Sequence, residues 1–221
     1  MKKTSEIFWL ILGMVFIFNP YKDYSEVLEV DNKLVLVNRK YKLSNKYIPK
    51  ELQKPNIRFS DNMLKEEKLM TKESGKALEE LMLEAEKEEG IILYAISGYR
   101  CYNTQNNLYK HRVKILGMEE ADKYVAKAGH SEHQTGLAMD LTNREGLNKF
   151  LNDDFGKTTE GIWIRENAHR FGFIIRYPRN KEHITGYGYE PWHIRYVGKK
   201  VAEEIYNNNL VLEEYIKLCN F

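Results

Sequence analysis

Cysteine is scarce in this chain, with only Cys101 and Cys219 among its 221 residues. The two stand far apart, and no Cys-x-x-Cys pair occurs, so a zinc site built from thiolates is not expected. A disulfide between them stays open, because pairing depends on the fold and the compartment rather than on the count.

An excess of one charge is also lacking. The chain carries 34 Lys and Arg against 32 Asp and Glu, a net charge of +2, so nothing in its composition calls for a nucleic-acid partner. It has no internal repeat and no low-complexity tract. A hydrophobic content of 43% and a charged content of 30% are ordinary for a soluble globular protein, and the length suffices for one sizeable core.

Long hydrophobic runs are confined to the N-terminus, where residues 7–18 read IFWLILGMVFIF after Lys2 and Lys3. This run is shorter than the ~20 residues of a membrane-spanning helix and matches the apolar part of a signal peptide. No small-x-small cleavage motif and no lipid-carrying cysteine follow it. We expect residues 1–20 to be a signal peptide or an uncleaved signal anchor, with a buried N-terminal helix as the alternative. Either targeted form leaves the rest of the chain outside the cytoplasmic membrane, in contact with it through this segment only.

Apolar spacing divides the remainder into a connector, 21–60, and a domain, 61–221. The connector holds a short run rich in β-branched residues, 34–37, which predicts a strand. Within the domain, helical periodicity that ends at glycines predicts the helices, and continuous or alternating apolar runs predict the strands. The predicted helices cover 61–89, 103–116, 119–127, 160–171 and 199–207, and the predicted strands cover 91–97, 137–142, 173–177 and 190–198. Helices interspersed with strands in this way indicate a single α+β domain.

The segment GHSEHQTGLAMDLT, residues 129–142, concentrates side chains that can bind a metal. If the chain turns at Gly136, where glycine permits a tight approach, His133 and Asp140 can converge on one point. His193 would join them from the last predicted strand. Two imidazoles and one carboxylate make a three-ligand Zn²⁺ site with its fourth position open to water, as in catalytic rather than structural zinc sites.

A zinc-bound water needs a general base, and Glu190 is the candidate. It stands three residues before His193, and Pro191 between them stiffens the corner, which would hold the carboxylate near the metal rather than on it. Such a glutamate can take a proton from the water and pass it to a leaving amine. The alternative makes Glu190 a surface residue and His193 an ordinary core histidine.

One arginine and two polar side chains could bind a substrate. Arg100 follows the predicted buried strand 91–97, where its guanidinium could grip a carboxylate with two hydrogen bonds. Gln105 could add a donor and Ser131 a hydroxyl close by. Taken alone, each of these residues is more simply explained by routine turn or helix-capping chemistry.

Together these segments resemble one family, the VanY-type zinc D,D-carboxypeptidases, with the related LdcB-type L,D-carboxypeptidases. The first family motif, S-x-H-x-x-G-x-A-x-D, is matched by Ser131, His133, Gly136, Ala138 and Asp140. The second, E-x-x-H, is matched by Glu190 and His193, and S-G-Y-R at 97–100 and Gln105 also match. The similarity runs from about residue 30 to residue 207, and the two metal motifs are its specific part.

The resemblance implies a hedgehog/VanX-like fold, a single α+β domain with a central antiparallel sheet flanked by helices. It implies that zinc is held by His133, Asp140 and His193. It also implies that Glu190 acts as the catalytic base. The implied substrate is the stem peptide of bacterial peptidoglycan, from which a metal-activated water would release a C-terminal D-alanine with no covalent intermediate.

Substrate contacts follow from the same resemblance. Arg100 would polarise the scissile carbonyl or bind the substrate, helped by Ser131 and Gln105. Trp192 would also contact the peptide, and aromatic side chains of the pocket such as Trp163, Tyr187 and Trp192 should decide the specificity. An L,D-carboxypeptidase, a D-Ala-D-Ala dipeptidase and an endopeptidase of the same fold remain alternatives. A non-catalytic wall-binding module that keeps zinc for structure is the alternative from another class.

Overall fold

The computed structural model describes residues 32–219 except 148 and 150. The predicted signal segment, 1–20, lies outside the described residues. Among those that are described, no helix is both long enough and apolar enough to cross a membrane. Cys101 and Cys219 are free thiols, so the disulfide left open by the sequence is not formed in this structure.

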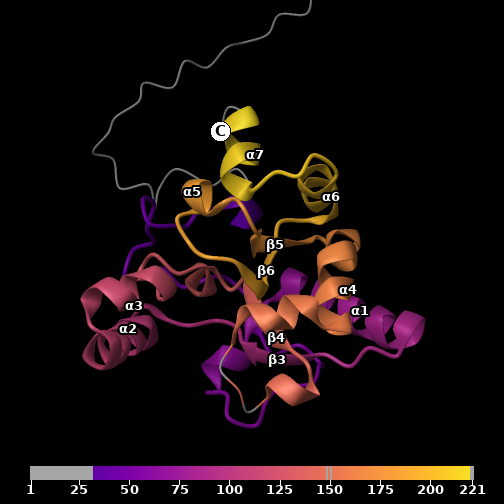
Figure 1. Ribbon diagram of the computed structural model, residues 1–221, viewed down its shortest axis with the longest axis horizontal. Helices are drawn as coiled ribbons and strands as arrows, with labels where there is room; N and C mark the ends of the chain where they lie inside the picture. Colours follow the sequence, from indigo (N-terminus) through magenta and orange to yellow (C-terminus); the bar gives the residue numbers. More distant parts are fainter. Residues whose placement is uncertain (1–31, 148, 150, 220–221) are drawn as a thin grey trace, which may run out of the picture.

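Helices and strands alternate along the chain (Figure 1). The α-helices are α1 (Lys72–Glu89), α2 (Tyr102–Leu116), α3 (Met118–Tyr124), α4 (Thr159–Asn167), α5 (Glu182–Thr185), α6 (Lys199–Asn207) and α7 (Leu212–Leu218). The strands are β1 (Leu52–Gln53), β2 (Met70–Thr71), β3 (Tyr94–Ser97), β4 (Ala138–Thr142), β5 (Phe173–Tyr177) and β6 (Glu190–Tyr196). Short 3₁₀ turns are η2 (Asn32–Leu34), η3 (Glu66–Lys68), η4 (Glu132–Thr135), η5 (Arg144–Gly146), η6 (Asp153–Lys157) and η7 (Ala168–Phe171).

A four-stranded sheet in the order β3-β4-β6-β5 forms the centre, and all its neighbours run antiparallel. β4 pairs with β6 so that Asp140 faces His193, and β5 pairs with β6 so that Tyr177 faces Glu190. The mixture of helices with an antiparallel central sheet confirms the predicted α+β class. Because β4 and β6 are neighbours, two segments some fifty residues apart in sequence meet at the middle of the sheet.

One face of the sheet packs on α1 and α4. Leu78 and Leu81 of α1 and Ile164 of α4 meet Met139 and Ile194 of the sheet in the main hydrophobic cluster. The strands alternate, so Asp140 and His193, which neighbour Met139 and Ile194, point to the opposite face. In Figure 1, α1 and α4 lie to one side of the sheet and the α2–α3 pair to the other. The main core thus fixes the strands that carry the polar face.

The run at 34–37 does not form a strand, which corrects the sequence prediction. Its apolar side chains, Leu34 and Leu36, pack against a second cluster formed with β5, α6 and α7. The carbonyls of Lys33 and Val35 accept hydrogen bonds from the Arg195 guanidinium at 2.8 and 2.9 Å. These bonds satisfy carbonyl groups that would otherwise need the N–H groups of a neighbouring strand. A short strand does occur later in this segment, as β1, which pairs with β2.

The first long helix begins at Lys72, not near residue 61 as the apolar spacing predicted. The preceding residues form η3 and β2, and β2 pairs with β1 instead of extending the helix. Leu64, one of the residues that suggested an earlier start, is 55% exposed. The C-terminal helix α7 was not predicted at all, although Leu212 within it is fully buried.

Candidate active site

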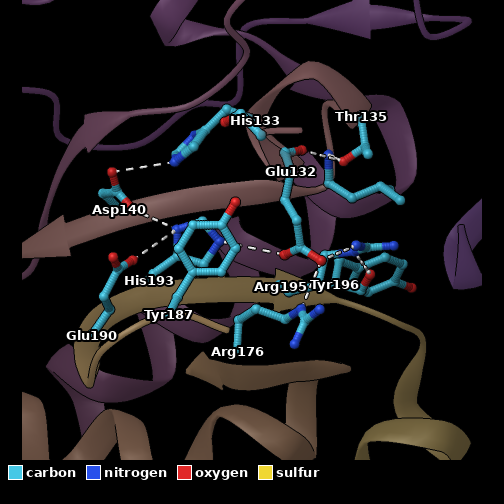
Figure 2. Close-up of polar contacts among 12 residues, drawn as sticks. Glu132, His133, Thr135, Asp140, Arg176, Tyr187, Glu190, His193, Arg195 and Tyr196 are labelled. Atoms are coloured by element: carbon cyan, nitrogen blue, oxygen red, sulfur yellow. Dashed lines mark hydrogen bonds and ion pairs between the residues drawn. The ribbon is translucent and has the colours of Figure 1, made fainter. Parts of the chain in front are cut away.

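His133, Asp140 and His193 come together on the polar face of the sheet, from η4, β4 and β6 (Figure 2). One ligand atom from each lies within 4.8 Å of the others. Nε2 of His133 is 3.3 Å from one Asp140 oxygen, and Nδ1 of His193 is 2.9 Å from the other. All three side chains are buried. The structure therefore brings together the three residues predicted as metal ligands.

Gly136 makes this convergence possible. It ends η4 with φ +68°, in the left-handed region that glycine adopts without strain. A Cβ at this position would lie 2.9 Å from Leu52 and 3.2 Å from Pro49. The chain can therefore reverse directly from η4 into β4, which places His133 over Asp140.

Hydrogen bonds on the far side of each imidazole decide which nitrogen faces Asp140. Nδ1 of His133 is 2.7 Å from the carbonyl oxygen of Gly98, so it donates and leaves the Nε2 lone pair facing the carboxylate. Nε2 of His193 is 3.4 Å from a carboxylate oxygen of Glu132, so Nδ1 is the nitrogen that faces Asp140. Each histidine thus turns one nitrogen toward the same small space, where a metal could bind it in place of a proton.

The donor set fits zinc. Two imidazole nitrogens and a carboxylate are common zinc ligands, with bond lengths of about 2.0–2.2 Å. Tetrahedral coordination at such lengths separates neighbouring ligand atoms by roughly 3.3 Å. The separations in the structure are of this order, 3.3 Å from His133 to one Asp140 oxygen and 2.9 Å from His193 to the other.

Charge and burial also favour a cation at this position. Burial and the nearby Arg100 lower the pKa of His133 to about 4, so its imidazole is neutral and able to bind metal at neutral pH. Burial would raise the pKa of Asp140, but His133 and His193 hold it well below its usual range. Burial would lower the pKa of His193, but hydrogen bonds to Asp140 and Glu132 raise it to about 9. Carboxylates on both sides of His193 therefore attract positive charge.

Glu190 lies beside this group rather than within it. Its nearest oxygen is 3.8 Å from Nδ1 of His193, and its side chain retains 18% exposure. Burial, with Asp140 adding to it, raises the Glu190 pKa to about 7, while the charge of His193 opposes the rise. The position one residue before Pro191, at the first residue of β6, keeps the carboxylate close to the ligands. A carboxylate with such a pKa can both accept and return a proton near neutral pH.

Arg100 is held by three side-chain acceptors. Its Nε donates to Oε1 of Gln105 at 3.0 Å, and its terminal nitrogens donate to Ser97 at 2.7 Å and Ser131 at 3.5 Å. Gln105 is itself fixed, because its amide nitrogen donates to the carbonyl of Ala126 at 2.7 Å. Two of the five N–H groups of the guanidinium have no partner among the described residues. Gln105 and Ser131 therefore contact Arg100, whose guanidinium keeps two donors for a substrate.

Trp192 is not brought to the group. It alternates with His193 along β6 and packs against the main hydrophobic cluster on the other face of the sheet. Trp163, another predicted pocket aromatic, belongs to the same hydrophobic cluster. The aromatic side chains near the group are two tyrosines, of which the sequence prediction named Tyr187 but not Tyr177. The ring of Tyr177 lies 5.0 Å from that of His193, and Tyr187 lies 5.0 Å from Tyr177.

The sequence prediction also missed a buried ionic cluster behind His193. Glu132 is fully buried and contacts Arg176 at 2.7 Å and Arg195 at 2.6 Å, both of them fully buried. Burial would raise the pKa of Glu132, but the two guanidinium groups hold it well below its usual range. The sequence did hold a sign of this cluster, because β5 and β6 are apolar strands that each contain an arginine. A buried arginine needs an acidic partner.

Comparison with known proteins places the chain in a family. The sequence model of the VanY family, described as D-alanyl-D-alanine carboxypeptidase, matches residues 67–199, more than half of the chain. The putative carboxypeptidase YodJ of Bacillus subtilis is 48% identical over 188 residues, which span 85% of this chain and 68% of that protein.

Two solved structures are also similar. The LdcB LD-carboxypeptidase has a TM-score of 0.76 and 47% identity, over 82% of this chain and 84% of that one. A mutant form of the vancomycin-resistance D,D-pentapeptidase VanY, in complex with Zn(II), has a TM-score of 0.67 and 32% identity, over 84% and 99%. The expected hedgehog/VanX-like domain and the family resemblance are both confirmed. The chain belongs to the VanY family of D-alanyl-D-alanine carboxypeptidases.

Proposed function

We propose that this protein is a zinc-dependent carboxypeptidase that removes a C-terminal D-alanine from peptidoglycan stem peptides. The observation that carries the proposal is the buried group of His133, Asp140 and His193 with the Glu190 carboxylate beside it. The similarity to a Zn(II)-bound D,D-pentapeptidase and to a peptidoglycan LD-carboxypeptidase supports both the metal and the substrate class.

His133, Asp140 and His193 would hold the zinc ion. Zinc in a three-ligand site supplies a Lewis acid for the carbonyl and lowers the pKa of a coordinated water to about 7. His133 would bind through Nε2 and His193 through Nδ1, because their other nitrogens are engaged by Gly98 and Glu132.

Glu190 would move the proton. Its carboxylate accepts a proton from the attacking water and returns it to the nitrogen of the departing D-alanine. Partial exposure leaves this carboxylate open to the substrate side, whereas the ligands behind it are buried. One side chain thus serves first as base and then as acid, and no covalent intermediate is required.

Arg100 would orient the substrate. Its two remaining N–H groups can bind the carbonyl oxygen under attack or the terminal carboxylate of the peptide. Ser97, Gln105 and Ser131 fix the guanidinium plane before the substrate arrives. Gln105 and Ser131 would therefore act through Arg100. Trp192 points to the opposite face of β6, so any contribution from it to substrate binding would come from that face.

The direct test is digestion of defined stem peptides by the zinc-loaded protein, with products identified by mass. A pentapeptide ending in D-Ala-D-Ala should lose a single D-alanine. Release of the intact D-Ala-D-Ala dipeptide would instead indicate dipeptidase or endopeptidase action. A non-catalytic wall-binding module would give no product although it bound zinc.

An L,D-carboxypeptidase is the second candidate, because the similarity to the LdcB LD-carboxypeptidase, 47% identity, exceeds the 32% found for the D,D-pentapeptidase. Such an enzyme cuts a bond between an L and a D residue. The same assay separates the two: a D,D-enzyme shortens the pentapeptide to a tetrapeptide and stops, whereas an L,D-enzyme shortens a tetrapeptide to a tripeptide.

The substrate class also bears on location. Peptidoglycan lies outside the cytoplasmic membrane, so the enzyme would be secreted or anchored by residues 1–20, with 21–60 as connector and 61–221 as peptidase domain. N-terminal sequencing of the protein recovered from membranes and from the medium would test this. A mature chain starting beyond residue 20 indicates cleavage, and an intact Met1 in the membrane fraction indicates an anchor.

A further inference from the structure

We propose that Glu132 is a positioning residue for His193. Its buried carboxylate accepts a hydrogen bond from the Nε2–H group of this imidazole and thereby turns Nδ1 toward the metal. The inference rests on the proposed zinc site, since it concerns how one ligand of that site is held. Glu132 does not touch the space between the three ligands, so it acts through His193 rather than on a substrate.

The two oxygens of Glu132 have separate tasks (Figure 2). Oε1 accepts from Nε of Arg176 at 2.7 Å and from a terminal nitrogen of Arg195 at 2.6 Å. Oε2 is directed to Nε2 of His193 at 3.4 Å. Because both guanidinium groups contact Oε1, the other oxygen is left for the imidazole. The two permanent positive charges also keep the carboxylate ionised, so Oε2 can only accept a proton in this contact.

The arginines are anchored independently of the metal ligands, which fixes the orientation of Glu132. Arg176 binds both oxygens of Glu213 on α7, at 2.7 and 2.9 Å. Arg195 donates to the carbonyls of Lys33 and Val35 at 2.8 and 2.9 Å. The carboxylate is thus clamped from two sides, and the direction of Oε2 does not depend on whether a metal is bound.

The two histidine ligands are supported by different acceptors. His133 donates to the backbone carbonyl of Gly98, whereas His193 faces a carboxylate. A carboxylate acceptor makes the coordinating nitrogen more basic than a neutral carbonyl does, and loss of such a partner typically weakens metal binding by about 10–100-fold. Glu132 would therefore tune His193 specifically.

The test compares Glu132→Gln with Glu213→Gln. Both variants remove one carboxylate charge from the same arginine cluster, but Glu213 has no contact with His193, so it is the matched control. Zinc affinity is measured by competition with a chromophoric chelator. We expect Glu132→Gln to weaken it by about 10–100-fold and Glu213→Gln to change it by less than about 3-fold. A cobalt(II)-loaded sample should show an altered visible spectrum only for Glu132→Gln.

A charge-balanced variant serves as the control for loss of folding. If Glu132→Gln alone loses its circular dichroism signal, Glu132→Gln with Arg176→Met removes one charge of each sign and keeps Arg195 on Lys33 and Val35. This double variant should fold and still bind zinc weakly. With saturating zinc, kcat should fall while KM stays nearly constant, since Glu132 does not touch the peptide.

The outcomes separate the two proposals. If the wild-type protein binds zinc and Glu132→Gln binds it as tightly as Glu213→Gln does, the role of Glu132 is overturned while the proposed function stands. If the wild-type protein does not bind zinc, the proposed function fails, and the role of Glu132 fails with it.

Discussion

His133 and Asp140 are seven residues apart in the sequence, and their side chains meet with 3.3 Å between Nε2 and a carboxylate oxygen. One local turn, closed by Gly136, accounts for this contact. The third member of the group, His193, is added by strand pairing, because Asp140 and His193 stand opposite each other in the β4–β6 ladder. The group therefore depends on one glycine and on one strand register.

Replacement of Gly136 by alanine should destabilise the protein. A non-glycine residue in the left-handed region costs about 1–2 kcal/mol, and the new Cβ would also meet Leu52 and Pro49. We expect the melting temperature to fall by roughly 2–8 °C. Gly188→Ala is the matched control, because a Cβ there meets nothing within 4 Å and its φ is not in that region. An equal effect of both substitutions would contradict this account of the turn.

Substitution of Glu190 should separate chemistry from metal binding. Glu190→Ala should keep about one zinc per chain but lose about 10²–10⁴-fold in kcat, because proton transfer is lost while the ligands remain. His133→Ala should lose both zinc and turnover. Zinc is measured by elemental analysis and turnover by D-alanine release. Unchanged activity in Glu190→Ala would remove its assignment as the base.

Arg100→Lys should impair turnover with little change in zinc content. Lysine keeps the positive charge but cannot reach Ser97, Gln105 and Ser131 while offering a planar pair of donors to a substrate. We expect a loss of about 10²–10³-fold in kcat/KM. The exposed Arg165 provides a control, since Arg165→Lys should leave the activity unchanged. Wild-type kcat/KM in Arg100→Lys would show that charge alone suffices.

Removal of the metal should abolish activity but not the fold. The main hydrophobic cluster lies on the opposite face of the sheet from the ligands, so the core does not depend on zinc. We expect a chelator to eliminate D-alanine release and to lower the melting temperature by roughly 5–10 °C, with the far-ultraviolet circular dichroism signal retained. Zinc should restore the activity and magnesium should not, because magnesium prefers oxygen ligands. Full activity in the metal-free protein is the contrary result.

Much of the fold was predictable because it follows from local pattern. The glycine after α1 and the apolar run at β3 placed both elements, and the alternation along β4 placed Asp140 on the face opposite Met139. The meeting of His133 and Asp140 was predictable for the same reason, since a turn and a strand bring one side chain over the other. The partner strand β6 followed from the family resemblance as well as from its own alternation.

What the sequence did not predict depends on contacts between distant segments. The run at 34–37 has strand-forming residues, but its carbonyls bind Arg195 instead of a neighbouring strand. Glu132 stands within the recognised motif at an unspecified position, and its role depends on Arg176 and Arg195. No local spacing encodes these pairings.

Anomalous diffraction at the zinc edge, on crystals of the zinc-loaded protein, would locate the metal itself. We expect one strong peak per chain, within bonding distance of Nε2 of His133, Nδ1 of His193 and a carboxylate oxygen of Asp140, with Glu190 nearby but not bound. A peak at any other group of residues, or no peak between these three side chains, would show that they do not form the zinc site.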